Sequence, residues 1–376
     1  MEHTERKYYI DWLRNIGILL LFPFHTARIF DWLEPNYVEG VKNAFSVDFI
    51  LATSPWFMPL LFLLAGVSSY YALQKRSGKG YVKERFLRLF VPLMFGIIIL
   101  VPPMAYYAKI FHSGYSGSYF EFLKGYFLDF SDLTGYFGGF TPSHLWFIAF
   151  LFIISLACLP LMKSAIKRKF TPRFFQNPCL LPLVFIGFTV LSALPEIGGK
   201  NIFVYAGFFL FGFFIVTNAA ILSMIEQFKR LYLFIAVIGI AGMFVQIYTI
   251  GWRDGFTLPG ILTSLYFYLT ITAVLLTLLG YGKRFLDRKN RLVSYFNKAA
   301  FPVYVLHHTF LIVVGYYILK IINHGVIPFI AIMIISFCLS IITYEVFKRV
   351  KPLAFLLGVK LLTDNKQTPY CQVGRA

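Results

Sequence analysis

The stretch DWLRNIGILLLFPFH, residues 11–25, is apolar enough to enter a membrane, yet it carries an acid, an arginine and a histidine. On an α-helix, the 11 residues from Arg14 to His25 turn through about 20° more than three full turns, so both side chains share one face. Asp11 lies within about 60° of that face, and the helical rise separates Arg14 from His25 by roughly 16 Å. The stretch predicts a membrane helix with a charged stripe, bent near Pro23 because proline removes a backbone hydrogen bond.

The rest of the chain has the composition of a membrane protein. Of its 376 residues, 58% are hydrophobic and 14% charged, and the mean hydropathy is +0.70. Soluble domains are roughly 45–50% apolar, and a helix needs about 20 apolar residues to cross a bilayer. We place such runs at 10–30, 47–72, 89–108, 144–162, 179–195, 202–225, 231–250, 259–281, 299–319 and 326–346. The sequence therefore predicts an all-α, polytopic membrane protein with about ten transmembrane helices.

The basic residues alternate from loop to loop. Of the 35 Lys and Arg residues, 27 fall before the first span, in alternate loops and in the C-terminal tail, and only 6 fall in the intervening loops; the other two, Arg14 and Arg28, lie within the first span. Cytoplasmic loops carry the Lys/Arg excess, so we expect both termini to be cytoplasmic, in a multi-pass protein of a bacterial plasma membrane. This pattern explains the basic excess by topology, and we expect no nucleic-acid partner. The first apolar run is too long for a cleavable signal peptide.

The chain has no Gly/Ser-rich linker and no obvious internal repeat. We therefore expect one membrane domain over residues 1–350, followed at 351–376 by a cytoplasmic, partly disordered tail on the membrane surface. Four cysteines are scattered without metal-ligand or redox spacing, and we interpret them as structural.

Ionisable groups within a bilayer cost about 2.5–3.5 kcal/mol each on insertion scales, so those that remain usually face the protein interior. The stripe of Asp11, Arg14 and His25 suits a donor that enters from the cytoplasm with an anionic head, as acyl-coenzyme A would. Arg14 would hold the donor, and His25 would act as general base on an incoming hydroxyl. Alternatively, Asp11 and Arg14 only pair with each other, and His25 is a helix contact. The spacing leaves both interpretations open.

Two further motifs have an equally open meaning. Arg85 and Arg88, at i and i+3 in YVKERFLRLFVP, would clamp phosphates at the inner entrance of the third span, or simply mark its cytoplasmic end. In SHLWF, residues 143–147, His144 and Trp146 are either interface anchors or acceptor-binding groups.

The segment FPVYVLHHTF, residues 301–310, places three polar side chains in the middle of a span. Tyr304 shares a face with His307 at i+3 and with His308 at i+4. Adjacent histidines diverge by about 100° on a helix, and no carboxylate cluster joins them, so we expect no metal site.

Together these motifs resemble the membrane-bound acyltransferase family 3, over essentially the whole chain. Arg14 and His25 match its arginine, ten intervening residues and histidine. The pair Arg85-x-x-Arg88, HLWFI at 144–148 and VYVLHH at 303–308 match later motifs. The double histidine, the PFH stretch and the tail YEVFKRVKPLAFLLG look most like the branch that succinylates glucans.

The resemblance implies transfer of an acetyl or succinyl group from cytoplasmic acyl-CoA to a carbohydrate hydroxyl, commonly outside the membrane. His25 becomes the catalytic base, Arg14 positions the donor and Asp11 orients Arg14. Arg85 and Arg88 would contact the donor phosphates.

Weaker assignments from the same resemblance place Tyr304 and His307 in the cavity wall, with His308, His144 and Trp146 as further candidates on the acceptor side. Acyl-CoA is a substrate here, and we expect no permanently bound cofactor. The sequence shows no fused extracellular hydrolase-like domain, so we expect the spans and outer loops alone to bind the glycan. It does not indicate an oligomeric state.

Two other functions compete with this one. A transporter of an anionic or carbohydrate solute would also use intramembrane Arg and His, but the paired, Gly/Pro-interrupted helices typical of many transporters are not evident. A non-catalytic membrane scaffold would not need a charged stripe.

Overall fold

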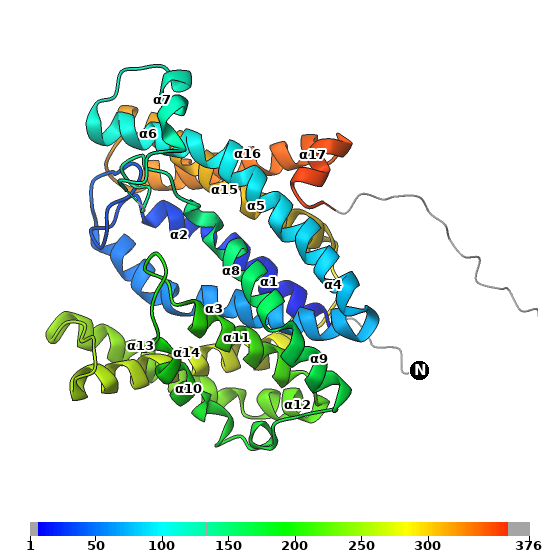
Figure 1. The fold of residues 1–376 in the computed structure, drawn as a ribbon. Coiled ribbons are helices and arrows are strands. Elements are labelled where there is room, and N and C mark those ends of the chain that lie inside the picture. The colour runs from blue at the N-terminus through cyan, green and yellow to red at the C-terminus, as the bar shows by residue number, and fades with distance from the viewer. Residues whose placement is uncertain (1–6, 133, 360–376) are drawn as a thin grey trace, which may run out of the picture.

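The computed structural model describes residues 7–132 and 134–359, which form a bundle of helices. Within these residues the only extended pairing is an isolated bridge between Ile197 and Lys200. Many of the long helices run between the same two ends of the molecule, and α1 begins at one of them (Figure 1). The prediction of an all-α protein is confirmed.

Six helical segments of the described chain are long and apolar enough to cross a membrane. They are α3 (Ala44–Lys75), the continuous run Gly78–Ser113, α13 (Lys229–Thr249), α14 (Leu258–Phe285), α15 (Arg291–Ile321) and α16 (Val326–Phe347). Two bent pairs bring the number to eight. They are η3 and α8 (Ser143–Ala157) with α9 (Leu159–Lys167), bent by 47°, and α11 (Ile202–Ile215) with α12 (Ala219–Gln227), bent by 102°. A multi-pass membrane protein is therefore supported.

The count of ten spans is not confirmed, because two predicted spans fold as shorter helices. The first consists of α1 (Tyr8–Leu19) and α2 (Leu21–Ala27), and the fifth contains the apolar segment Leu181–Ser192, which includes α10 (Val184–Ser192). The remaining short helices are α7 (Tyr119–Tyr126), η4 (Arg173–Gln176) and α17 (Lys351–Leu356). Most of the predicted C-terminal tail, from residue 360 onward, lies outside the described residues.

Proline explains the interruptions of two spans. The first span breaks at Leu20, close to the predicted bend. Pro23 has no backbone N–H, so it cannot donate a hydrogen bond to the carbonyl oxygen of Leu19, four residues earlier. The run Gly78–Ser113 contains α4 (Gly78–Arg85), η1 (Phe86–Phe90), α5 (Val91–Phe95), η2 (Gly96–Leu100) and α6 (Val101–Ser113). Here η1 and η2 are π-helical turns, and each contains the residue four positions before Pro92 or Pro102. In an α-helix, the proline ring would clash with the carbonyl of the residue four positions earlier. The wider π-helical turn makes room for the ring.

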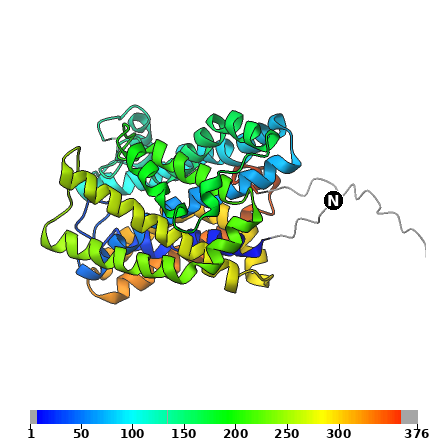
Figure 2. The same ribbon diagram turned by 90° about the horizontal axis from the view of Figure 1, so that it is seen from below.

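Glycine allows α3 and α11 to pack with their backbones in contact. A Cβ added at Gly66 would lie 1.8 Å from the Phe209 carbonyl oxygen, and one at Gly212 would lie 1.9 Å from the Leu63 carbonyl oxygen. Small residues at membrane helix interfaces permit such close approach. Helices α13 and α14 form an antiparallel pair along one side of the bundle, visible from below in Figure 2. Helices α15 and α16 pack together on another side (Figure 1).

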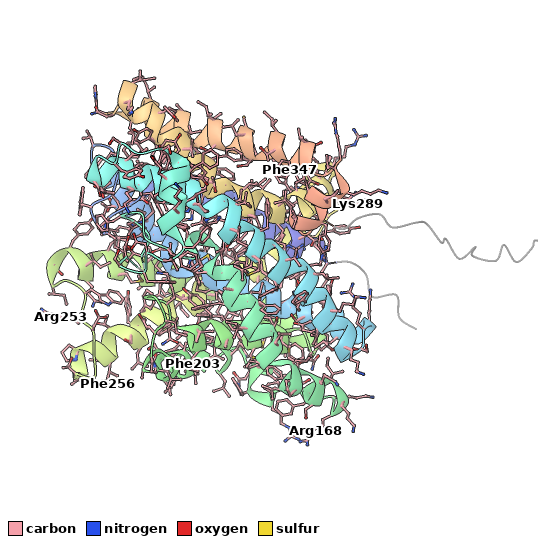
Figure 3. All side chains as sticks on the ribbon, turned by 45° about the horizontal axis from the view of Figure 1, so that its top comes forward. Arg168, Phe203, Arg253, Phe256, Lys289 and Phe347 are labelled. Carbon is pink, nitrogen blue, oxygen red and sulfur yellow. The ribbon has the colours of Figure 1, made fainter. Side chains whose placement is uncertain are left out.

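The segments assigned to one side of the membrane carry 27 Lys and Arg residues, and those assigned to the other side carry 6. Lys289 and Arg168, from the more basic set, lie at one end of the bundle, whereas Arg253 and Phe256 lie at the opposite end (Figure 3). We call these the basic end and the distal end.

Candidate functional site

Four of the seven histidines meet inside the bundle. His25 comes from α2, His307 and His308 come from α15, and His144 comes from η3 (Ser143–Leu145). The ring of His25 lies 4.1 Å from that of His308 and 5.2 Å from that of His307, measured between centroids. The His144 ring lies 5.2 Å from His307 and 5.1 Å from His308. The structure therefore brings together predicted site residues that are more than 280 positions apart in the chain. We call this group the histidine cluster.

Backbone carbonyls determine which nitrogen carries the proton in two of these rings. His307 Nδ1 lies 2.6 Å from the Tyr304 carbonyl oxygen, and His144 Nε2 lies 3.2 Å from that of Val305. Because a carbonyl only accepts hydrogen bonds, these nitrogens must be the donors. In the neutral rings, His307 Nε2 and His144 Nδ1 then carry lone pairs. Both atoms are buried without a partner among the described residues, so each is suited to accept a bond from a hydroxyl.

The remaining two histidines are less constrained. Both nitrogens of His308 are buried without a hydrogen-bond partner in the described part of the chain, and His25 is partly exposed. Of the four rings, that of His25 is thus the most accessible to an incoming group. Among residues 7–132 and 134–359, no three His, Cys, Asp or Glu side chains are arranged to hold a metal ion.

Tyr304 and Tyr37 hold the segment that carries His144. The Tyr304 hydroxyl donates a 2.6 Å hydrogen bond to the His144 carbonyl oxygen, and the Tyr37 hydroxyl donates a 2.7 Å bond to Ser143 Oγ. The Tyr37 ring also meets His308 edge-on at 5.6 Å. Burial raises the pKa of the Tyr37 phenol, so this side chain remains a neutral donor. Tyr37 lies on the loop of residues 28–43, which therefore covers the histidine cluster at its distal side.

A buried ion pair shapes this covering loop, and sequence reasoning missed it. Arg28 Nη1 lies 2.7 Å from Asp31 Oδ2, and Arg28 Nη2 donates to the Pro35 carbonyl oxygen at 3.2 Å. Asp31 is fully buried. The available signal was an arginine in the last turn of the predicted first span, followed three residues later by an acid.

Replacing Asp31 by Ala should destabilise the protein by about 3 kcal/mol, the lower end for a broken buried ion pair, because Arg28 would keep only the more exposed Glu34, 3.2 Å away, as its carboxylate partner. Thermal unfolding of the purified protein measures this loss. Lys42→Ala is the matched control in the same loop, because its ion pair with Glu39 is partly exposed and worth about 1 kcal/mol or less. Equal melting temperatures for both variants would contradict the structural role assigned to Asp31.

Asp11 and Arg14 form an ion pair near the basic end of α1. Asp11 Oδ2 also accepts a 3.0 Å hydrogen bond from Asn297 Nδ2, and Asn297 Oδ1 accepts one of 3.2 Å from Asn15 Nδ2. This polar network joins α1 to α15, the helix that carries His307 and His308. Sequence reasoning missed Asn15 and Asn297, although Asn15 lies one turn after Asp11. The ion pair fits both earlier interpretations, because Asp11 can orient Arg14 for a donor or serve only as its partner.

The other predicted residues do not join the histidine cluster. Arg85 Nη2 donates to Ser69 Oγ at 2.9 Å, and its Cζ lies 4.6 Å from the centre of the Tyr81 ring. Arg88 is half exposed and pairs with Glu84 at 3.2 Å. The two guanidinium groups therefore have different protein partners, and the phosphate clamp stays a prediction.

Trp146, which follows His144 by two residues, packs elsewhere as well. Its aromatic contacts are with Phe62, Phe150 and Tyr205, and the closest of these rings, that of Tyr205, has its centroid 5.2 Å away.

Comparisons with known proteins agree with the motifs. A family profile described as "Acyltransferase domain" matches residues 7–345. Similar curated proteins include glucans biosynthesis protein C of Escherichia coli strain K12 and of Escherichia coli O157:H7. Each is 24% identical over 399 residues, covering 97% of this chain and 98% of the relative. No solved structure matches the chain. Because the family profile covers nearly the whole sequence, the chain belongs to the membrane-bound acyltransferase family 3.

Proposed function

We propose that this membrane acyltransferase moves an acetyl or succinyl group from cytoplasmic acyl-CoA to a hydroxyl of a glycan at the distal end of the bundle. The observation that carries the proposal is the placement of His25 against His307 and His308, which His144 from a third segment also contacts. The glycan acceptor is inferred from relatives that are named for glucan biosynthesis.

The orientation in the membrane follows from charge. The basic end faces the cytoplasm in this proposal, because 27 of the 35 Lys and Arg residues lie in segments assigned to that side. An open groove of about 590 Å³ lies there between α4 and α9, lined in part by Lys79, Lys83 and Lys163. These ammonium groups suit the phosphates of coenzyme A. Arg85 and Arg88, from the same segment, would add guanidinium contacts to the donor.

In the proposed reaction, His25 acts as the general base. It removes the proton from the acceptor hydroxyl, and the oxygen attacks the carbonyl carbon of the thioester. A C–O bond forms, the C–S bond breaks, and coenzyme A leaves as a thiolate that is then protonated. His307 Nε2 and His144 Nδ1, which hold lone pairs, would accept hydrogen bonds from hydroxyls of the acceptor and so orient it.

Arg14 positions the donor in this proposal, and Asp11 orients Arg14 through their ion pair. Asn297 holds Asp11 from α15, so the donor side and the histidine cluster share one helix. The roughly 16 Å rise from Arg14 to His25 then separates the site that holds the donor from the site of chemistry.

Removing Arg14 should therefore affect the donor more than the glycan. We expect Arg14→Ala to raise the KM for acyl-CoA by about tenfold or more, the scale of one charged hydrogen bond, with the KM for the glycan nearly unchanged. The assay follows release of coenzyme A thiol by protein in lipid vesicles, with glycan present or absent. Arg284→Ala at the basic end of α14 is a matched loss of charge. An equal rise of the KM for acyl-CoA in Arg14→Ala and Arg284→Ala would contradict the role of Arg14. Glycan transport without thiol release would favour a transporter.

A further inference from the structure

We propose that a second cavity at the distal end is the subsite for a sugar ring of the acceptor glycan. This inference rests on the proposed function and adds a place where the chain grips the glycan beside the reacting hydroxyl. The cavity has a volume of about 290 Å³ and lies among α3, α11, α13 and α14, the loop before α11 and the loop between α13 and α14. Its lining combines aromatic rings with charged groups: Tyr205, Tyr268, Trp252, Phe267, Glu196 and Lys200.

The aromatic residues offer flat surfaces on which the C–H face of a sugar can pack. Trp252 is 40% exposed and is held in place, because its Nε1 donates to Asp254 Oδ1 at 2.5 Å. Its ring meets Phe267 edge-on at 5.2 Å. Aromatic rings with one wet edge are favoured where a binding surface must be both apolar and able to hydrogen-bond. Trp252 thus supplies a rigid wall.

Polar groups in the same cavity can bond to sugar hydroxyls. The Tyr205 hydroxyl has no hydrogen bond to any described residue, and the Glu196 carboxylate forms no ion pair with one, although both line the cavity. Within the described residues, Lys200 Nζ donates a hydrogen bond to the neighbouring Gly199 carbonyl oxygen, at 3.4 Å. A carboxylate, an ammonium group and a phenol around one opening offer acceptors and donors together.

The loop that carries Glu196 and Lys200 is firmly built. Ile197 and Lys200 exchange backbone hydrogen bonds of 2.9 and 3.2 Å. The Asn201 side chain donates to the Leu194 carbonyl at 2.8 Å and accepts from the first amides of α11. These contacts fix the loop before a ligand arrives, which reduces the entropy lost on binding.

One short segment connects this cavity to the histidine cluster. Trp146 packs on Tyr205, with ring centroids 5.2 Å apart, and Lys200 Nζ lies 5.9 Å from the Trp146 ring. His144, two residues earlier, belongs to the histidine cluster. Two residues span at most about 7 Å of chain. The segment that carries His144 thus also packs, through Trp146, against two residues that line the cavity.

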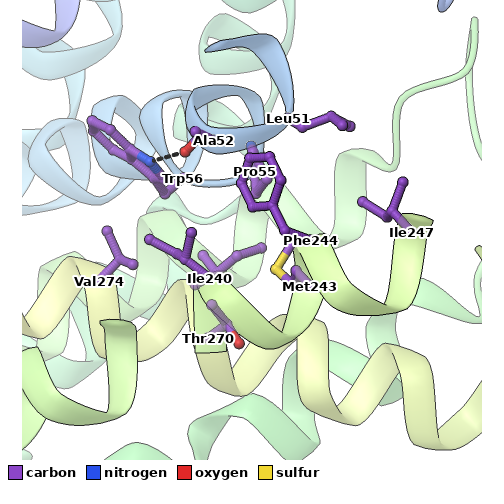
Figure 4. Close-up of a pocket in the computed structure, with 11 residues that line it drawn as sticks. Leu51, Ala52, Pro55, Trp56, Ile240, Met243, Phe244, Ile247, Thr270 and Val274 are labelled. Carbon is purple, nitrogen blue, oxygen red and sulfur yellow. Dashed lines mark hydrogen bonds between the residues drawn. The ribbon is translucent and has the colours of Figure 1, made fainter. Parts of the chain in front are cut away.

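The size of the adjoining apolar gap favours a sugar over a lipid. This gap lies between α3, α13 and α14, where Leu51, Pro55, Met243 and Ile247 line it and also line the cavity (Figure 4). Its volume is only about 10 Å³, room for about one water molecule and not for an acyl chain. An amphiphilic lipid would need the cavity for its head group and the gap for its acyl chain, whereas a sugar ring needs the cavity alone.

The test measures binding of linear glucan oligosaccharides by isothermal titration calorimetry. The protein is held in phospholipid nanodiscs without alkyl glycoside detergents, whose sugar heads would compete. We expect Trp252→Ala and Glu196→Gln to weaken glucan binding, the first by about tenfold or more, as for an aromatic anchor. Phe256→Ala is the matched control in the same loop, because Phe256 is 82% exposed and does not line the cavity. Tyr205→Phe removes a single hydroxyl and covers the case in which Trp252→Ala fails to fold.

Kinetics separate this inference from the proposed function. If acyl transfer occurs, the cavity variants should raise the KM for the glycan and change the KM for acyl-CoA less than twofold. Wild-type glucan affinity in the folded Trp252, Glu196 and Tyr205 variants would overturn the subsite while leaving acyl transfer intact. The subsite would also be refuted if the wild-type protein did not bind glucan. The same holds if the cavity variants lost a bound phospholipid and not glucan. Glucan binding that depends on Trp252 without acyl transfer would support the cavity and refute the enzyme.

Discussion

His25→Gln should lower kcat for acyl transfer by about 10²–10⁴-fold, the usual contribution of a positioned general base. Glutamine keeps much of the volume and can form hydrogen bonds, but it cannot take a proton from the acceptor hydroxyl. His25 is the partly exposed member of the histidine cluster, whereas the rings of His144, His307 and His308 are buried and so less accessible to the acceptor. The measurement is the initial rate of acyl transfer with both substrates saturating.

The control for His25 is another histidine outside the cluster. His324 lies exposed in the loop between α15 and α16, and His324→Gln should leave kcat unchanged. The affinity for acyl-CoA should also survive in His25→Gln, because Arg14 and the basic groove are intact. A kcat close to the wild-type value in folded His25→Gln would exclude this residue as the base.

Gly212→Leu and Gly66→Leu should each abolish the folded protein. A Cβ at either position would lie within 2 Å of a carbonyl oxygen on the facing helix, so α3 and α11 would have to separate along their contact. Overpacking of a well-packed core by side chains typically costs about 1–3 kcal/mol, and here the obstacle is backbone, which yields less easily. The yield of monodisperse protein after size-exclusion chromatography measures the effect.

Gly187 supplies the matched control for this prediction. It lies within α10, and a Cβ there meets nothing within 4 Å. Gly187→Ala should be neutral or stabilising by up to about 1 kcal/mol, because alanine favours helix more than glycine does. A normal yield of folded Gly212→Leu would show that the close contact between α3 and α11 is not needed.

The sequence predicted the helical class because it depends on local patterns, and local motifs singled out each of the four histidines as a candidate. Apolar runs of span length predicted the long helices, and the period of the helix placed His25 on the face of Arg14. The spacing of Tyr304, His307 and His308 correctly showed that they lie close together. The meeting of α2, α15 and η3 depends on tertiary packing, and only the family resemblance indicated that these segments act together.

Other features have no local signature. Asn15 and Asn297 lie 282 residues apart in the chain, so their hydrogen bond is invisible to periodicity. The cavity near Trp252 uses two loops and the ends of several helices, none of which carries a motif. The ten-span count depended on hydropathy, which cannot show that Pro23 divides the first span into shorter helices.

The most direct test of the central claim is mass spectrometry of the glycan after incubation. Wild-type protein in lipid vesicles, supplied with acetyl-CoA or succinyl-CoA and glucan oligosaccharides, should add the mass of one acyl group to the glycan and release an equal amount of coenzyme A. His25→Gln should give neither product above background. A glycan of unchanged mass with both donors, from wild-type protein shown to be folded, would contradict the assignment as a glucan acyltransferase.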